Sequence, residues 1–482
     1  MLFNTFHFWI FFFLLSAIFF SIKKSWQPWL LLPASYYFYM CWQPEYALLM
    51  LTSTLIAFFS SYGIDAANSS AWKRFYFVVG TLANLGILFF FKYADFFSRN
   101  VREALASMNV FVDIQDLNLV LPVGISFFTF QAASYTFDVY RGVTRVERNP
   151  FYFALFVSFF PQLVAGPIER SDELLPQMRT PKSFDFARMT RGLRIALWGL
   201  FKKVVIADLL STVVNTVYAT PEQFSGPILI LATTFFALQI YCDFSGYSDI
   251  ALGVADVMGY RLMDNFRQPY FATSIGEFWR RWHISLSTWF RDYVYLPLGG
   301  NRVSRTRWML NLLIVFGVSG LWHGAAWTFV IWGLLHGGFL ILEGLTADAR
   351  KRLHQRLGLS SRPWLLRPLQ TICVFVLVTI GWVFFRASSV SQALYILSHW
   401  WDFSGFQIAD LWSLGLPRVE MMLCFAVTAV LAVVDGLLYY QPTLVLTGWR
   451  ARPARWACYF GMIFGLVFFG VLGKVEFIYF QF

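Results

Sequence analysis

The sequence predicts an all-α protein that crosses a membrane many times. Of its 482 residues, 58% are hydrophobic and 13% are charged, whereas a soluble domain carries about 25% charged residues. Its apolar runs are filled by 55 Phe, 22 Tyr and 20 Trp residues. Backbone polar groups in lipid must pair within their own segment, so such runs predict spanning helices. The runs show no alternation of period two, which argues against an outer-membrane barrel.

A spanning helix needs about 20 apolar residues, and fewer when it is sheltered inside a bundle. Several candidates are short, so we expect about 11 true spans, with re-entrant or interfacial segments among the rest. In the first candidate the positive charges, Lys23 and Lys24, follow the apolar core, which favours a retained helix with its N-terminus outside. The candidates lie near residues 2–22, 29–42, 44–62, 75–91, 119–140, 150–165, 193–219, 227–246, 309–322, 325–345, 368–386, 419–440 and 455–473.

The segment near 150–165 is the first candidate that we expect not to cross. It ends in PQLVAGP, where Pro161, Gly166 and Pro167 would break a regular helix. Non-helical backbone at membrane depth is tolerated only inside protein or beside a water-filled cavity. We find no internal repeat and no long linker, so we expect one membrane domain spanning residues 1–482, with most motifs between 121 and 345.

The net charge of +11 does not indicate nucleic-acid binding. The basic residues lie between apolar segments, as the positive-inside bias predicts, where they can also contact anionic membrane lipids. The five cysteines are scattered and form no CxxC pair, which excludes a disulfide framework. The main basic loops are 141–148, 170–203, 261–307, 349–367 and 450–455.

The stretch FWRRWHISLSTWFRDYVYLPLGG, residues 278–300, is unusually rich in ionisable groups. If 275–293 is one helix, it has an apolar stripe made of Ile275, Trp279, Trp282, Leu286, Trp289 and Tyr293. One flank carries Arg280, His283, Ser287 and Arg291, and the other carries Arg281, Ser285, Thr288 and Asp292. The pattern fits an interfacial helix. It fits equally well a helix whose His283 faces inward while the arginines hold a phosphorylated donor.

A second histidine lies in the apolar stretch SGLWHGAAWTFVIWGLLHGG, residues 319–338. His323, flanked by Trp322 and Gly324, is either a hydrogen-bonded core residue or a proton acceptor that serves a hydroxyl near pH 7. Gly320 and Gly324 favour close approach of a backbone or a ligand. His336 lies 13 residues beyond His323, so we expect it on the same helix and count it as a possible site residue.

Two acidic residues, Asp243 and Asp249, follow an apolar segment in YCDFSGYSDIALG, residues 241–253. They can pair with the arginines of 261–291, or one of them can orient a histidine. The motifs HExxH, GxGxxG and the Walker loop are absent. The histidines at 7, 336, 354 and 399 lack carboxylate or Cys neighbours at metal-ligand spacing, so we expect no metal site.

Taken in order, these motifs resemble those of the membrane-bound O-acyltransferase (MBOAT) family, and most of all its bacterial polysaccharide branch, the alginate O-acetyltransferase I type. The resemblance covers most of the chain. It includes LPVGISFFTFQAASYTFDVYRG, FFPQLVAGPIER, YCDFSGYSDIALG, the stretch from Phe278 through GGNR, GLWHGAAWTFVIWGLLHG and the terminal FIYFQF.

The resemblance implies a ring of about 11 helices around a thin centre, with a cytoplasmic tunnel for the acyl donor and an outer funnel for the acceptor. It implies that His323 is catalytic and that His283 occupies the family's second polar position, which holds either His or Asn. It also implies acetyl-CoA as donor substrate with no bound cofactor, and a location in the bacterial cytoplasmic (inner) membrane. Arg280, Arg281 and Arg291 are candidates for the donor phosphates. Asp243, Asp249, Trp322, Ser287 and His336 are candidates for supporting the site.

The expected acceptor is a hydroxyl of an envelope or exported polysaccharide, such as alginate, cellulose or peptidoglycan. The acetyl group reaches it directly or through a periplasmic SGNH-type or related acetyltransferase partner. Two other classes stay open, namely a transporter or flippase for an acyl or lipid-linked sugar, and a scaffold for a polysaccharide-modifying complex. A transporter would more often show paired repeats with interrupted helices in both halves.

Overall fold

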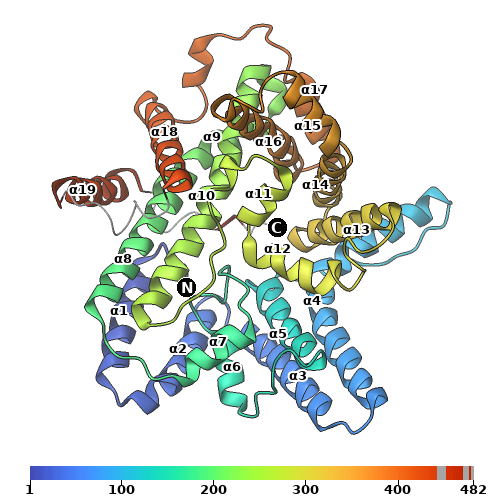
Figure 1. Ribbon diagram of the computed structural model, residues 1–482, viewed down its shortest axis with the longest axis vertical. Coiled ribbons are helices and arrows are strands. Elements are labelled where there is room, and N and C mark those ends of the chain that lie inside the picture. Colours follow the sequence, from blue (N-terminus) through green and yellow to red (C-terminus); the bar gives the residue numbers. More distant parts are fainter. Residues whose placement is uncertain (442–451, 471–476, 479–482) are drawn as a thin grey trace. The chain divides into compact units, whose positions relative to one another are not determined.

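The computed structural model describes residues 1–441, 452–470 and 477–478, and within those residues all regular structure is helical (Figure 1). The all-helical prediction is therefore confirmed. Contacts divide the chain into two compact units, one of Met1–Leu193 with Ala251–Met263 and one of Arg194–Ile250 with Asp264–Phe482. We call them unit 1 and unit 2. The single domain expected for residues 1–482 stays a prediction.

Unit 1 contains helices whose apolar faces pack around α3, α4 and α5. Its elements are α1 (Phe6–Ser21), η1 (Lys24–Trp26), α2 (Gln27–Met40), α3 (Tyr46–Ala66), α4 (Ser70–Ser107), α5 (Ile125–Tyr140), α6 (Pro150–Ser158), α7 (Ser171–Arg179), and the first parts of α8 (Phe186–Leu200) together with the last turns of α10 (Gly226–Met258).

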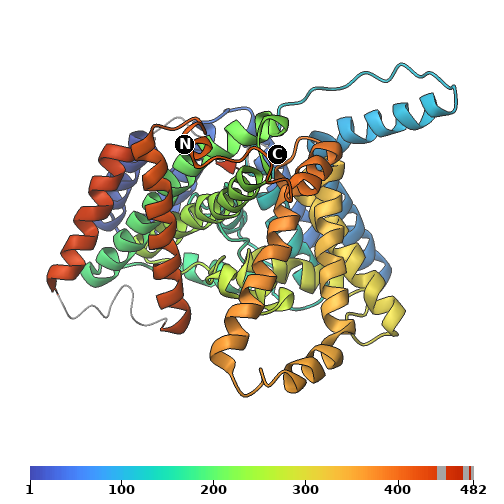
Figure 2. The same ribbon diagram turned by 90° about the horizontal axis from the view of Figure 1, so that it is seen from above.

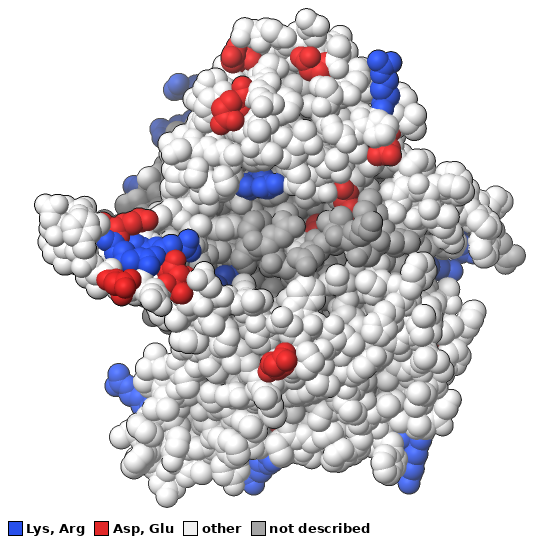
Figure 3. Space-filling view, turned by 180° about the vertical axis from the view of Figure 1, so that it is seen from behind, with Lys and Arg blue, Asp and Glu red and all other residues white. Residues whose placement is uncertain are grey.

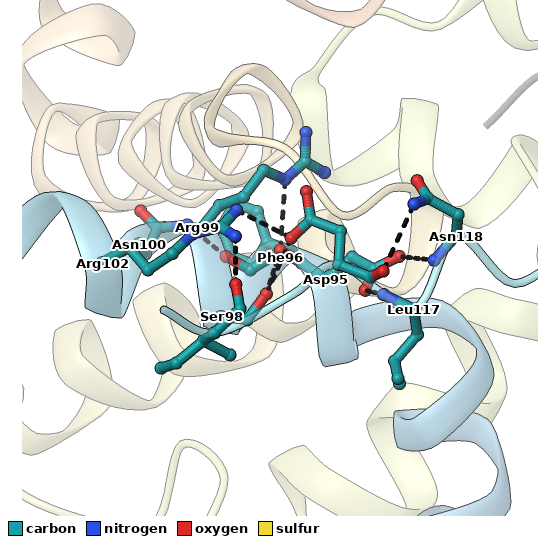
Figure 4. A network of polar contacts seen from close by, with 10 residues as sticks. Asp95, Phe96, Ser98, Arg99, Asn100, Arg102, Leu117 and Asn118 are labelled. Carbon is teal, nitrogen blue, oxygen red and sulfur yellow. Dashed lines mark hydrogen bonds and ion pairs between the residues drawn. The ribbon is translucent and has the colours of Figure 1, made fainter. Parts of the chain in front are cut away.

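The C-terminal end of α4 is tied to the segment that follows it by a polar network (Figure 4). Asp95 accepts hydrogen bonds from the backbone amides of Leu117 at 2.7 Å and Asn118 at 3.0 Å. Arg102 forms an ion pair with Asp116 at 2.7 Å. These contacts hold the returning chain against a helix of 38 residues.

The segment 150–165 departs from a regular span as predicted. Helix α6 ends at Ser158, and the following residues up to Arg170 are non-helical although most are buried. Side chains satisfy part of this buried backbone, since Ser35 accepts from the Phe160 amide at 3.2 Å and Gln131 donates to the Phe156 carbonyl at 2.7 Å. The irregular chain is thus enclosed by protein, the setting in which such backbone is tolerated.

Unit 2 is built on α13, which packs along α14, and on α14, which also packs against α16 and α11. Besides the parts of α8 and α10 it contains η2 (Phe201–Ala207), α9 (Asp208–Ala219), η3 (Pro221–Gln223), η4 (Pro269–Phe271), α11 (Ile275–Arg281), α12 (Ile284–Phe290), η5 (Arg291–Tyr295), α13 (Arg305–His323), α14 (Trp327–Leu345), α15 (Ala347–Arg356), α16 (Pro363–Arg386), α17 (Val390–His399), η6 (Ile408–Trp412), α18 (Arg418–Tyr440) and α19 (Arg452–Phe469).

Six helices in the described part of the chain are long and apolar enough to cross a membrane, namely α3, α4, α10, α14, α16 and α18. Each coincides with a predicted span. The expected total of about 11 stays a prediction, and the candidate 455–473 and the terminal FIYFQF extend into residues outside the described ones. Charged side chains are few on the face drawn in Figure 3, where uncharged surface predominates. Several apolar helices of this length indicate a multi-pass membrane protein.

Candidate functional site

The stretch 275–293 is not one helix, so that prediction is wrong. Helix α11 ends at Arg281, Trp282 is extended (φ −103°, ψ 128°), and His283 takes the left-handed conformation (φ 42°, ψ 56°) before α12 begins. A further π-helical turn, η5, follows α12. Apolar residues continue at helical spacing on both sides of the break, so periodicity alone could not reveal it. A left-handed non-glycine residue is uncommon, and such conformations cluster at functional sites.

Asn265 holds the chain on the far side of this break. Its carbonyl accepts from the Ile284 amide at 2.9 Å, and its side-chain Oδ1 accepts from the Ser285 hydroxyl at 2.6 Å. Its Nδ2 donates to the Ser248 hydroxyl on α10 at 3.3 Å. The first amides of a helix have no partner within it, so Asn265 supplies what α12 lacks. Sequence patterns do not single out Asn265, because these contacts join segments separated along the chain.

His283 is fully buried in an aromatic setting. Its ring lies edge-on to Phe244, with centroids 4.6 Å apart, and 5.9 Å from the ring of Trp322. Burial lowers the pKa of His283 to about 3. The imidazole is therefore neutral near pH 7, and a neutral ring can donate one hydrogen bond while its other nitrogen accepts.

His323 ends α13 and is only 2% exposed. Its ring contacts Trp322 at 4.9 Å and Trp332 of α14 at 4.8 Å between centroids. Helices α13 and α14 approach closely at Gly320, which has no Cβ. A Cβ there would lie 2.3 Å from the Phe329 carbonyl oxygen, too close for any other residue. The glycine thus serves the approach of two backbones, one of the two uses that its position suggested.

Aromatic contacts bring the predicted histidines together within unit 2. Trp322 contacts both His283 and His323, and Trp332 contacts both His323 and His336. His336 is fully buried in α14, whereas His323 ends α13, so the prediction that one helix carries both is wrong. The Trp279 ring lies 5.0 Å from the His336 ring between centroids. His283 and His323 thus both contact the indole of Trp322. His336 is connected to His323 through the indole of Trp332.

Two of the three predicted arginines line a cleft of about 480 Å³, and the third does not. Arg280 and Arg291 line it together with Ser287. Arg281 instead forms an ion pair with Glu277 at 2.8 Å, and its guanidinium lies 4.6 Å from the centre of the Tyr439 ring. Arg291 also pairs with the neighbouring Asp292, at 2.7 Å.

The cleft adjoins both histidines along the chain. Its walls include Ile284, which follows His283, and Ser319, which lies four residues before His323 on α13. Trp279, which contacts His336, lines it as well. A molecule that places an anionic group near the two arginines would therefore lie beside the elements that carry the histidines.

Asp243 and Asp249 pair with lysines, and not with the arginines of 261–291. Asp243 forms an ion pair with Lys203 at 2.5 Å, and Asp249 forms one with Lys202 at 2.9 Å. Lys203 also binds Asp208 at 2.8 Å, five residues later, a spacing that the π-helical η2 aligns. Phe244, next to Asp243 on α10, contacts the His283 ring. The ion pairs therefore hold in place the part of α10 that packs against His283.

The chain is similar in sequence to known membrane-bound proteins. The model of the membrane-bound O-acyltransferase family matches residues 143–390, which include every site residue described above except Tyr439 of α18. The chain is 39% identical to the probable alginate O-acetylase AlgI of Pseudomonas aeruginosa, over 81% of this chain and 73% of that protein. It is 37% identical to the peptidoglycan O-acetyltransferase of Helicobacter pylori, over 80% of this chain and 75% of that protein.

A more distant relative is the teichoic acid D-alanyltransferase of Bacillus subtilis, which is 30% identical over 45% of this chain and 58% of its own length. The family match extends over more than half of the chain, and the two acetylation enzymes align with four fifths of it. The chain therefore belongs to the membrane-bound O-acyltransferase family and is an O-acyltransferase.

Proposed function

We propose that this O-acyltransferase moves acetyl groups from cytoplasmic acetyl-CoA to hydroxyls of an envelope or exported polysaccharide, in the bacterial cytoplasmic membrane. The observation that carries the proposal is the pair of buried histidines, His283 and His323, around Trp322 beside a cleft with two arginines. Two relatives that align with most of the chain are named for acetylation of alginate and of peptidoglycan, which favours acetyl as the group and a glycan as the final acceptor.

The chemistry assigns His323 as the general base. Its imidazole takes the proton of the acceptor hydroxyl as that oxygen attacks the thioester carbonyl. A carbon–oxygen bond forms, and the tetrahedral intermediate collapses as the carbon–sulfur bond breaks. The proton held by His323 passes to the departing thiolate, so that free CoA and an acetyl ester are the products.

His283 is suited to stabilise the oxyanion of that intermediate. A buried, neutral imidazole donates a hydrogen bond without bringing a charge of its own, and preorganised donors in a water-poor site stabilise developing charge strongly. An Asn at this position, the alternative in the family, can donate in the same way through its amide. Trp322 and His336 then serve as the aromatic and polar surroundings of the pair.

The donor is proposed to bind with its phosphates at Arg280 and Arg291. Guanidinium groups match phosphate oxygens in charge and geometry. These two line a cleft whose walls include Ile284, next to His283, and Ser319, one helical turn before His323. Ser287 lines the same cleft and can add a hydroxyl contact. Arg281, held by Glu277 and Tyr439, is better explained as a residue that fixes α11.

The acceptor side is proposed to involve a periplasmic SGNH-type or related acetyltransferase, which would take the acetyl group and pass it to the polymer. Direct transfer to the glycan is the other route. Both routes use the same base and the same donor, so the site of unit 2 serves either.

The test is to incorporate the purified full-length protein into liposomes and add acetyl-CoA labelled in its acetyl group. Release of CoA that depends on an added acceptor and on His323 supports the proposal. Movement of label across the bilayer without thioester cleavage would instead establish a transporter. Binding of polysaccharide enzymes with neither activity would establish a scaffold, and either result would overturn the proposal.

A further inference from the structure

A second cavity in unit 2, of about 430 Å³, lies between α14, α15 and α16. Figure 2 shows α15 as the short orange helix that joins the neighbouring ends of the two longer ones. The wall of this cavity is largely aliphatic. Its leucines are Leu342, Leu353, Leu357, Leu359, Leu366, Leu369 and Leu377. A wall of this composition favours a hydrocarbon chain over a polar ligand.

One end of the cavity is polar and basic. Arg350 and His354 line it, together with Glu343. Glu343 is engaged, because it accepts from the Ile275 amide at 2.6 Å. Arg350 donates through Nη2 to the Glu343 backbone carbonyl at 2.7 Å, whereas its buried Nε has no partner among the described residues. The Nε–H group of Arg350 can therefore donate a hydrogen bond to a ligand at the polar end of the cavity.

The surrounding sequence is strongly basic and lies between two candidate membrane spans, α14 and α16. Residues 346–362 contain one acidic side chain, Asp348, against Arg350, Lys351, Arg352, Arg356 and Arg362. Clusters of this kind beside a spanning helix attract anionic lipid head groups.

The rim of the cavity is apolar and open to the outside. Leu353 and Leu357, which line it, are 53% and 60% exposed. Trp364, near the start of α16, is 75% exposed and lies two residues before the lining residue Leu366. Tryptophan is enriched where protein meets the membrane–water interface. Exposed leucines beside basic residues, with an exposed Trp on the adjoining turn of α16, favour a cavity mouth that membrane lipid can reach.

We propose that this cavity binds an anionic glycerophospholipid, with an acyl chain among the leucines and the head-group phosphate at Arg350 and His354. A free phosphate would leave the leucine wall empty, and a neutral lipid would not use the basic end. This lipid site shares no lining residue with the cleft of Arg280 and Arg291. The lipid is a further ligand of the protein and takes no part in the proposed acetyl transfer.

Native mass spectrometry of the detergent-purified full chain, titrated with phosphatidylglycerol or with phosphatidylcholine of the same acyl chains, tests the proposal. The wild type should retain phosphatidylglycerol preferentially. Arg350→Gln should weaken that binding about fivefold, the effect of one basic residue near an anionic surface, while Arg350→Lys should keep most of it. The matched control is Arg352→Gln on the same helix, because Arg352 is exposed and does not line the cavity.

A second variant tests the apolar half of the site. Leu366→Trp fills the cavity without changing charge, and it should weaken phosphatidylglycerol binding although Arg350 is intact. Equal binding of the two lipids by the wild type would overturn the proposal. Equal weakening by the Arg350 and Arg352 variants would overturn it too, since that result describes general surface charge, and so would unchanged binding by Leu366→Trp.

Discussion

Asn265 accepts a hydrogen bond from the Ser285 hydroxyl at 2.6 Å, across the break at which His283 takes the left-handed conformation. A non-glycine residue held in that region costs about 1–3 kcal/mol. Two hydrogen bonds between Asn265 and the start of α12 offset that cost, because each contributes roughly 1 kcal/mol. Asn265 thus positions the buried His283 through the backbone that follows it.

Replacing Asn265 with Ala should lower kcat by about 10- to 100-fold, because a small displacement of a catalytic group has a large effect on rate. KM for acetyl-CoA should change little, since the arginine cleft is intact. Steady-state kinetics in liposomes separate the two constants. Asn84→Ala is the matched control, because Asn84 is also buried and hydrogen-bonded to a serine, but lies in unit 1. An equal loss of kcat in both variants would show that Asn265 acts only through stability.

His283→Asn should keep a measurable part of the activity, whereas His283→Ala should lose most of it. Asn tolerates the left-handed backbone and retains a donor, whereas Ala has no donor and is less favourable there. Acetyl ester formed per unit of membrane protein is the quantity to compare. Complete loss in the Asn variant would contradict the role assigned here, and so would full activity in the Ala variant.

Acidification should destabilise the wild type relative to His283→Asn. The pKa of His283 is lowered by burial to about 3, so the neutral ring contributes stability above about pH 6.5, its ordinary pKa. That contribution is lost as pH falls from there toward 3, by on the order of 1 kcal/mol at pH 5.5. Thermal unfolding of both proteins at pH 7.5 and 5.5 measures it. The exposed His7→Asn variant is the control, and a gap that does not change with pH would contradict the prediction.

Arg280→Gln and Arg291→Gln should each raise KM for acetyl-CoA about tenfold, the effect of one lost hydrogen bond to a charged group. Arg281→Gln should leave KM nearly unchanged and lower the melting temperature, because it breaks the ion pair with Glu277. Initial rates against acetyl-CoA concentration, with thermal unfolding in parallel, give both values. A rise in KM confined to the Arg281 variant would reverse this assignment.

Composition sufficed to predict an all-helical membrane protein, and the prolines and glycine of PQLVAGP correctly indicated the end of α6. Local sequence could not show the break at His283, because the apolar stripe of 275–293 continues through it and the stabilising contacts come from Asn265. Nor could it show which arginines share a cleft. That outcome depends on where α11 and α12 point once they are separated, and on the partners that Glu277 and Tyr439 offer to Arg281.

The aspartates illustrate the same limit. Asp243 and Asp249 were expected near the arginines of 261–291 or near a histidine, but Lys202 and Lys203 lie closer in the fold. The π-helical turn η2 turns these two adjacent lysines into the protein interior, where both are buried. A pattern of regular helical spacing does not anticipate such a turn.

The central claim is that His323 accepts the proton of the acceptor hydroxyl, and the most direct measurement is the acetyl-ester content of the envelope polymer in cells that carry His323→Ala. Protein level in the membrane is measured alongside, and His7→Ala serves as the control. The account predicts a loss of acetyl ester of about 10²- to 10⁴-fold, the usual contribution of a general base, at normal protein level. Wild-type acetylation at normal protein level would contradict it.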